Sequence, residues 1–325
     1  MTSFCGLVGI RRIHLTLGLI ARWPFTESEE AMRKVCMIAC LAMISALLGA
    51  PNMGFAQTIK IGSKNFTESI LVANMMADVI EAAGLKVERK IGLGGTGVVH
   101  QALVSGEIDA YPEYTGTALL VQLKMPVNND PDVVYKTVKA EYESRFDSTW
   151  LAPLGFNDTY ALAMRMPDAE KLGLKTISDL AKKSSELTIG STQEFLVRPD
   201  ALPGLETTYG LKFKASRGMD PGLVYQAIAS GEVDVISVFT TDARIKANNL
   251  AVLADDKRFF PPYYLCPVVR QQALKSAPAL ASALGKLAGR FTEREIIDLN
   301  AAIDIDKKPA AEVAKAALKA KGIIP

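Results

Sequence analysis

The sequence GEIDAYPEYTGT at Gly106–Thr117 is repeated in outline by GEVDVISVFTT at Gly231–Thr241. The residues before each stretch also match, reading VHQALVS at Val99–Ser105 and VYQAIAS at Val224–Ser230. In each copy an apolar, helix-like segment ends at Ser-Gly, where glycine can take the left-handed conformation that ends a helix. A short apolar run follows, and its length predicts a buried strand. Each copy therefore predicts a helix, a tight connection and a strand.

A second pair of matching stretches lies upstream of each copy, with IGSK at Ile61–Lys64 and IGST at Ile189–Thr192. Each unit thus reads strand, helix, strand, helix, strand, which is the alternation that builds a parallel sheet with helices on its faces. In both units the last strand ends at an aromatic residue, Tyr114 or Phe239. We therefore expect an α/β fold of two lobes that face one cleft. The alternative is chance recurrence of a Ser-Gly-Glu connector, which the matching order of the two pairs disfavours.

Residues 32–56 have the features of a cleaved export signal. Met32 is followed by two basic residues, an apolar run over 35–48, and small residues at Gly54 and Ala56. This order of charged, apolar and small residues is typical of a secretory signal peptide. We predict cleavage after Ala56 and a mature protein located in the periplasm.

Residues 1–31 do not fit a leader, because acidic side chains are mixed with basic ones. We interpret them as a misannotated extension and Met32 as the true start. A membrane anchor is the alternative for the apolar run, but it needs about 20 apolar residues. Lipid attachment at Cys40 is a second alternative, but this cysteine comes too early in the apolar run to follow a complete apolar region.

Composition excludes several classes of function. The formal net charge is +2 with no basic cluster, so we expect no nucleic-acid partner. Three of the four cysteines lie in or before the leader, which leaves Cys266 alone in the mature chain without a disulfide or a thiolate metal site. We expect Cys266 in the core and His100, the single mature histidine, exposed or on a helix face. No catalytic constellation is evident, so we expect no enzyme activity, no metal and no cofactor.

Two local features carry further expectations. The glycine-rich stretch GLGGTG at 92–97 lacks the Lys-Ser/Thr of a P-loop and the spacing of a dinucleotide-binding loop. It is either a tight turn, which we favour, or a site where backbone amides bind a ligand. Ser63 or Asn65 is expected to cap the helix that follows the first strand.

The chain is expected to cross between the lobes twice, near Asp158 and near Tyr263. This predicts a first lobe formed by 57–158 and 264–325, a second lobe formed by 159–263, and a two-strand hinge.

Four motifs together resemble the substrate-binding proteins of osmoprotectant ABC importers, which take up glycine betaine, choline and carnitine. They are IGSKNFTE at 61–68, YPEYTGT at 111–117, NDTYALA at 157–163 and Thr241-Asp242. The resemblance covers essentially the whole mature chain. It implies a two-lobed periplasmic-binding-protein fold, type II-like, in which each lobe is a mixed sheet flanked by helices. It also implies a monomer that works with an ABC permease and its ATPase in the inner membrane.

In this family the quaternary ammonium of the ligand sits in a cage of aromatic rings. Carried over by motif, the cage residues are Tyr114, Tyr160, Phe239 and Tyr263. Lys64, Thr117 and Arg198 would hold a carboxylate or other polar tail, and Asp158 would lie beside the cation. The chain departs from the family at Phe239, where tyrosine is usual, and at Ala243, where glycine is common.

The chemistry of the ligand fits these residue types. A trimethylammonium group has no N–H to donate, whereas an aromatic face attracts it at about 0.5–2 kcal/mol per ring. Lys64 and Arg198 suit a carboxylate. Other interpretations stay open: the tyrosines as core or rim residues, Lys64 as a solvated charge, and Arg198 as a partner of Asp200. The ligand could also be another cationic solute, such as an amino acid, a polyamine or a betaine-like thione, and an enzyme on the same fold is a less favoured alternative.

Overall fold

The structure, a computed structural model, describes residues 58–325. The predicted extension at 1–31 and the predicted signal peptide at 32–56 lie outside the described residues. Among the helices of the described part, none combines the length and the apolar character that crossing a membrane requires.

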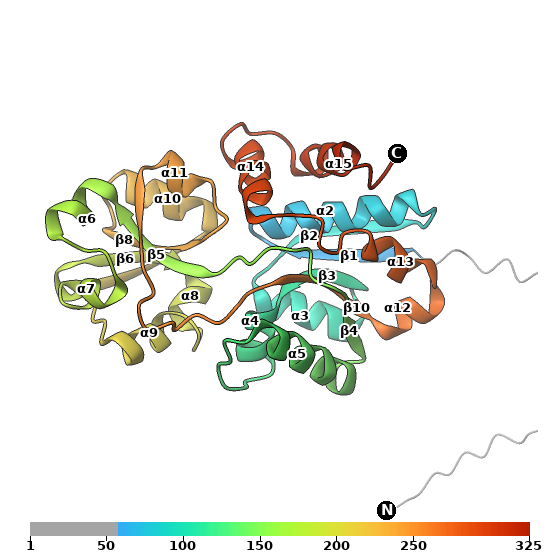
Figure 1. The fold of residues 1–325 in the computed structure, drawn as a ribbon, viewed down its shortest axis with the longest axis horizontal. Helices are drawn as coiled ribbons and strands as arrows, with labels where there is room; N and C mark the ends of the chain where they lie inside the picture. Colours follow the sequence, from blue (N-terminus) through green and yellow to red (C-terminus); the bar gives the residue numbers. More distant parts are fainter. Residues whose placement is uncertain (1–57) are drawn as a thin grey trace, which may run out of the picture. The chain divides into compact units, whose positions relative to one another are not determined.

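The first sheet has the strand order β2-β1-β3-β10-β4 (Figure 1). Its strands β1, β2 and β3 are parallel, and β10 runs antiparallel to β3 and β4. The strands are β1 (Ile59–Lys64), β2 (Val87–Gly94), β3 (Ala110–Tyr114), β4 (Ser148–Trp150) and β10 (Leu265–Arg270). The helices that belong with this sheet are α2 (Thr67–Ala82), α3 (Thr96–Ser105), α4 (Thr115–Thr117), a π-helix (Ala118–Gln122), α5 (Pro131–Arg145), α12 (Gln271–Ser276), α13 (Ala279–Gly285), α14 (Glu293–Asp304) and α15 (Ala310–Ala320). We call this set of elements the first lobe.

The second sheet has the strand order β7-β6-β8-β5-β9. Here β6, β7 and β8 are parallel, and β5 runs antiparallel to β8 and β9. The strands are β5 (Tyr160–Arg165), β6 (Thr188–Thr192), β7 (Ala215–Met219), β8 (Val235–Phe239) and β9 (Leu250–Leu253). The helices are α6 (Met166–Leu172), α7 (Ile177–Ala181), a 3₁₀ turn (Ser184–Glu186), α8 (Gln193–Val197), α9 (Leu202–Tyr209), α10 (Pro221–Ala229) and α11 (Arg244–Ala247). We call this set the second lobe.

The two sheets repeat one topology, as the paired sequence stretches predicted. Strands β3 and β8 occupy the same place in their sheets, next to β1 and β6. The preceding helices α3 and α10 are followed by Gly106 and Gly231, which have φ angles of 79° and 78°. Each sheet also receives one antiparallel strand, β5 or β10, directly after a crossing between the lobes, so both sheets are mixed.

The two crossing segments run side by side between the lobes (Figure 1). Asn157 and Tyr264 form an isolated antiparallel bridge, and the Asp158 amide donates to the Tyr263 carbonyl at 3.1 Å. Backbone contacts thus hold the two segments together.

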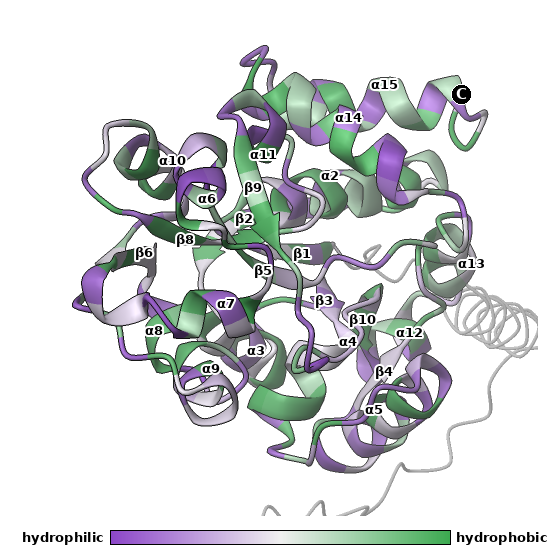
Figure 2. Ribbon diagram, turned by 60° about the vertical axis from the view of Figure 1, so that its left-hand side comes forward, coloured by the Kyte–Doolittle hydropathy of each residue, from purple (hydrophilic) through white to green (hydrophobic). Residues whose placement is uncertain are grey.

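Helix α2 lies at the centre of the first lobe, and its apolar composition fits this position. Helix α2 is apolar on most of its surface, and Leu71, Met75 and Val79 are fully buried. It packs between the first sheet and α15, which is why it needs no polar face over most of its length. Figure 2 shows the outer helices α14 and α15 with alternating apolar and polar bands, whereas β8 and β9 are apolar.

Cys266 is fully buried, as expected. His100 lies on helix α3, which was one of the two alternatives expected for it, and the other alternative is wrong because the side chain is only 8% exposed. Its ring packs edge-on against Tyr142 and Phe146, at centroid distances of 5.5 and 4.7 Å. Burial lowers the pKa of His100 below its ordinary value.

The predicted cap of α2 is also wrong. Ser63 is part of β1, and its hydroxyl accepts from the Gly92 amide at 2.8 Å, so it ties two strands together. The N-cap residue is Phe66, for which the described part contains no side-chain capping bond. The glycine-rich stretch likewise extends β2 to Gly94, which has a φ angle of 143° that favours glycine.

Candidate ligand-binding site

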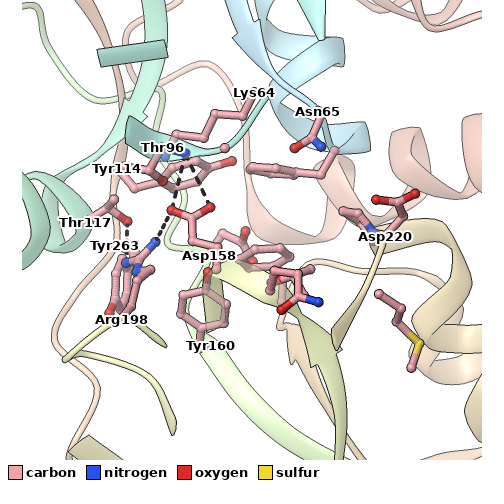
Figure 3. A pocket seen from close by; sticks show the side chains of 18 residues that line it. Lys64, Asn65, Thr96, Tyr114, Thr117, Asp158, Tyr160, Arg198, Asp220 and Tyr263 are labelled. Atoms are coloured by element: carbon pink, nitrogen blue, oxygen red, sulfur yellow. Dashed lines mark hydrogen bonds and ion pairs between the residues drawn. The ribbon is translucent and has the colours of Figure 1, made fainter. Parts of the chain in front are cut away.

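A cavity of about 210 Å³ lies between the lobes (Figure 3). Its walls include the ends of β1, β3, β5 and β8, the start of α3, helix α8 and the crossing segments. All eight residues that the motifs predicted for the site line it: Lys64, Tyr114, Thr117, Asp158, Tyr160, Arg198, Phe239 and Tyr263. The structure therefore brings the predicted residues together in one place.

The sheets set the positions of the aromatic side chains. Tyr160 and Phe239 are direct partners across β5 and β8, and their ring centroids are 4.7 Å apart. Tyr263 meets Tyr160 edge-on at 5.9 Å. Tyr114 ends β3 on the opposite side of the cavity, in the first lobe. Both lobes and one crossing thus contribute ring faces to the same cavity.

Hydroxyl groups fix two of these rings. The Tyr114 hydroxyl donates to Glu68 Oε1 at 2.7 Å, and the Tyr263 hydroxyl donates to Asp200 Oδ2 at 2.9 Å. Burial raises the pKa of both phenols well above the ordinary value, so both stay neutral donors. Phe239 has no hydroxyl and relies on packing against Tyr160 and Phe66.

Phe66 is a fifth aromatic residue at the cavity, and the sequence analysis missed it. It precedes the first turn of α2, and its ring stacks on that of Phe239 at 5.0 Å with an interplanar angle of 22°. Its distance to the Tyr114 ring is 6.1 Å. Phe66 therefore links the aromatic residues of the two lobes. Its place inside the motif IGSKNFTE was the available indication.

Lys64 is a buried charge, so its interpretation as a solvated side chain is wrong. It is 3% exposed, and its Nζ lies 2.6 Å from Glu113 Oε1. The same ammonium lies 5.3 Å from the centroid of the Tyr114 ring. The pair with Glu113 holds the lysine head at the wall of the cavity.

Arg198 pairs with Asp200, as one interpretation of the sequence held, and it also lines the cavity. Its Nε donates to Asp200 Oδ1 at 2.8 Å, and its Nη2 contacts the other oxygen of that carboxylate. Its Nη2 also lies 3.4 Å from Thr117 Oγ1, across the lobes. The guanidinium is 5.5 Å from the Tyr160 ring centroid. The ion pair with Asp200 therefore orients Arg198 without removing it from the cavity.

Glu194 is a second residue that the sequence analysis missed. It lies on α8, and its carboxylate oxygens each accept from the Thr96 amide at 3.3 Å, which joins the second lobe to the start of α3. Burial would raise the pKa of Glu194, but Lys64, Arg198 and the Thr96 contacts outweigh it and lower the pKa below its usual value. Gly95 and Thr96 line the cavity. The Thr96 amide at the end of the glycine-rich stretch thus binds a carboxylate of the protein itself.

The site has features of binding rather than of acid–base or metal chemistry. Across residues 58–325, no group of three or more His, Cys, Asp or Glu side chains is placed to hold a metal ion. His100 and Cys266 do not line the cavity. What the cavity presents is aromatic faces with a few charged groups at its edge.

Comparison with known proteins identifies the family. A family model described as the substrate binding domain of ABC-type glycine betaine transport system matches residues 57–320. The chain belongs to this family. The predicted resemblance is thereby confirmed, and the chain is a substrate-binding protein of an ABC transporter rather than an enzyme.

Two relatives and one solved structure of the family are similar over most of the chain. The ergothioneine transport permease/ergothioneine binding protein EgtU of Helicobacter pylori is 35% identical over 91% of this chain and 54% of its own length. The chain thus spans about half of that relative. The carnitine transport binding protein OpuCC of Listeria monocytogenes is 35% identical over 86% of this chain and 94% of its own. The crystal structure titled glycine betaine/carnitine/choline ABC transporter is 33% identical, with a TM-score of 0.66 over 82% of this chain and 99% of that one. The two-lobed fold expected from the sequence is therefore confirmed.

Proposed function

We propose that this protein captures quaternary-ammonium compatible solutes, of the glycine betaine, choline and carnitine type, for an ABC importer. The observation that carries the proposal is the set of five aromatic rings around one cavity between the lobes. Ring faces attract a trimethylammonium group without requiring hydrogen bonds from it. Three or four rings at about 0.5–2 kcal/mol each would supply much of the roughly −8 kcal/mol of a micromolar site.

The polar end of such a solute would lie toward Lys64, Thr117 and Arg198. These groups supply an ammonium, a hydroxyl and a guanidinium at the cavity wall. The pairs Lys64–Glu113 and Arg198–Asp200 hold the two cations in fixed positions, so little side-chain entropy would be lost on binding. Asp158 would lie beside the ammonium end.

We further propose that the lobes open and close about the two crossings to admit and release the solute. The lobes would consist of 57–158 with 264–325, and of 159–263. Contacts that join the lobes around the cavity, such as Phe66 on Phe239 and Thr96 to Glu194, support a closed form that a ligand bridging both lobes would favour. The protein would act as a periplasmic monomer, exported by the signal at 32–56, and would deliver the solute to an inner-membrane permease with its ATPase.

A betaine-like thione is a second candidate ligand. The name of the Helicobacter pylori relative includes ergothioneine, which carries a trimethylammonium group together with a thione. The same aromatic faces would serve that group, and the difference would lie at the polar end.

A thermal-shift screen of the purified protein tests the proposal. Its ligands are glycine betaine, choline, carnitine, ergothioneine and a basic amino acid. A true ligand at about 100 times its dissociation constant stabilises the folded protein by about 2.7 kcal/mol. We expect such a shift with at least one quaternary ammonium and none with the basic amino acid. A shift with the amino acid alone would contradict the proposal.

A further inference from the structure

Behind the aromatic rings lies a second, smaller cavity of about 40 Å³. Its walls come from both lobes and from the first crossing. Four carboxyl groups line it, and the two most deeply buried are Glu68 from α2 and Asp158 from the crossing, both at most 3% exposed. The other two, Asp242 and Asp304, are paired with Arg244. Two carboxyl groups buried this close together are unfavourable as two negative charges, so each must be assigned as ionised or protonated.

Glu68 is surrounded by donors. Oε1 accepts from the Tyr114 hydroxyl at 2.7 Å. Oε2 accepts from the Thr241 hydroxyl at 2.5 Å and from Asn300 Nδ2 at 3.4 Å. This is the environment of an ionised carboxylate, which accepts hydrogen bonds and donates none.

Asp158 has the opposite environment. Its Oδ1 accepts from the Thr241 amide at 3.1 Å. Its Oδ2 is buried and lacks a hydrogen-bond partner among the described residues. A charged oxygen buried without a donor is costly, whereas a protonated oxygen at the same place supplies a donor of its own.

The two carboxyl groups are held next to each other. Thr241 contacts both of them, through its amide to Asp158 and through its hydroxyl to Glu68. One residue of the second lobe therefore brings both carboxyl groups to the same small cavity, which both of them line. Two carboxylates that share a site cannot both ionise readily, so one of them tends to keep its proton.

The surrounding charges do not neutralise the pair. Among the described residues that line the cavity, Arg244 is the one basic side chain, and it is engaged by Asp242 and Asp304. Tyr225 adds a neutral hydroxyl. Lys64 lies beyond the Tyr114 ring and is paired with Glu113. Burial and, for Asp158, the neighbouring Glu68 raise the pKa of both acids, and that of Asp158 lies well above its ordinary value.

We propose that Asp158 and Glu68 share one proton when the lobes are together, carried on Asp158 Oδ2 and donated to Glu68. The enclosure depends on contact between the lobes, because Thr241 belongs to the second lobe while Glu68 and Asn300 belong to the first. Separation of the lobes admits water and lets Asp158 ionise. Closing around a ligand therefore takes up a proton from solvent.

The direction of the pH effect follows from the raised pKa. The closed form binds the proton more tightly than the open form, so a rise in pH favours the open form. Ligand affinity falls by up to about tenfold per pH unit, from the open-form pKa of Asp158 up to its closed-form pKa. Asp158 then contributes a hydrogen bond near the ligand rather than a full negative charge.

Two measurements test this. The first is calorimetry of a quaternary-ammonium ligand in buffers of different ionisation enthalpy, and it rests on the proposed function. The wild type should take up protons on binding, up to one per ligand, at a pH between the open-form and closed-form pKa values of Asp158. The variant Asp158→Asn, whose amide N–H donates where the O–H would, should take up none, whatever its absolute affinity. Asp304→Asn is the matched control from the same cavity and should behave as the wild type.

The second measurement needs no ligand. An infrared spectrum of the protein with its lobes in contact should contain the band of a protonated carboxyl group. The variant Asp158→Asn should lose this band, and Asp304→Asn should keep it. A band in the ligand-free protein, or one that appears with ligand, supports the shared proton. Absence of the band with and without ligand, or its persistence in Asp158→Asn, overturns the proposal. If no solute binds at all, the proposed function fails, and the ligand-free spectrum alone decides on the proton.

Discussion

Tyr160 and Phe239 are direct partners across strands β5 and β8, and their ring centroids lie 4.7 Å apart. Tyr160 begins β5, directly after the first crossing between the lobes, and Phe239 ends β8, the repeated strand of the second lobe. The antiparallel register therefore builds one aromatic wall of the cavity from two distant segments. The opposite wall comes from Tyr114 and Phe66 in the first lobe.

Replacing Tyr114 by Ala should weaken binding of a quaternary ammonium by at least about tenfold, because a desolvated ring face contributes about 1–2 kcal/mol. Tyr114→Phe is the matched control and keeps the ring. It removes the hydrogen bond to Glu68, so it should lower the free energy of unfolding by about 0.5–1.5 kcal/mol while changing affinity much less. Calorimetry together with thermal melts separates the two effects. Equal affinity in Tyr114→Ala and the wild type would remove Tyr114 from the cage.

Phe66 should behave as a cage residue although the motif analysis did not assign it. Phe66→Leu keeps an apolar side chain but loses the ring that stacks on Phe239. We expect affinity for choline to fall by about fivefold or more, since one cation–π contact is lost. Titration of the folded variant with choline measures this. Unchanged affinity would mean that Phe66 only packs against Phe239.

The role of Lys64 needs a paired variant. Lys64→Ala alone leaves Glu113 as a buried, unpaired charge, which costs about 3–5 kcal/mol of stability. Lys64→Met combined with Glu113→Gln removes both charges and keeps the volume. The double variant should lower the affinity for glycine betaine, which has a carboxylate, more than the affinity for choline, which has none. The ratio of the two dissociation constants is the readout, and an unchanged ratio would exclude Lys64 from carboxylate recognition.

The lowered pKa of Glu194 should make folding stability depend on pH in the direction opposite to that expected for Asp158. Its pKa is lowered, so its contribution to stability is present above the unfolded-state pKa and is lost as the pH falls through the folded-state value. The contact with the Thr96 amide should therefore weaken in acid, below about pH 4. Glu194→Gln should show a smaller loss of stability over this range than the wild type, as measured by denaturant unfolding. Parallel acid profiles for the two proteins would contradict this assignment.

Much of the fold could be predicted because the chain carries its pattern twice. The match between the stretches before Gly106 and Gly231 set the helix–strand order of both lobes, and the left-handed glycines followed from it. The cap of α2 could not be predicted in the same way. Ser63 has the residue type of a cap, but its place inside β1 commits its hydroxyl to Gly92.

The residues of the site that were assigned by motif could be predicted from the sequence. The eight motif residues lie around one cavity, whereas Phe66 and Glu194 were missed. Each of these two gains its place from a contact across the lobes, with Phe239 or with Thr96. Such contacts depend on how the lobes meet, and local sequence does not encode that. The burial of His100 was missed for a related reason, because Tyr142 and Phe146 come from a different helix region.

The most direct test of the aromatic cage compares choline with its uncharged isostere, in which a carbon atom replaces the quaternary nitrogen. The two molecules have nearly the same shape and apolar surface and differ in charge, so the comparison isolates the attraction of the ring faces for a cation. Calorimetric titration of the purified protein with both should give binding of choline at least about tenfold tighter than that of the isostere. Equal affinity for the two would mean that the cavity recognises an apolar shape, and the account of a cation-binding cage would be wrong.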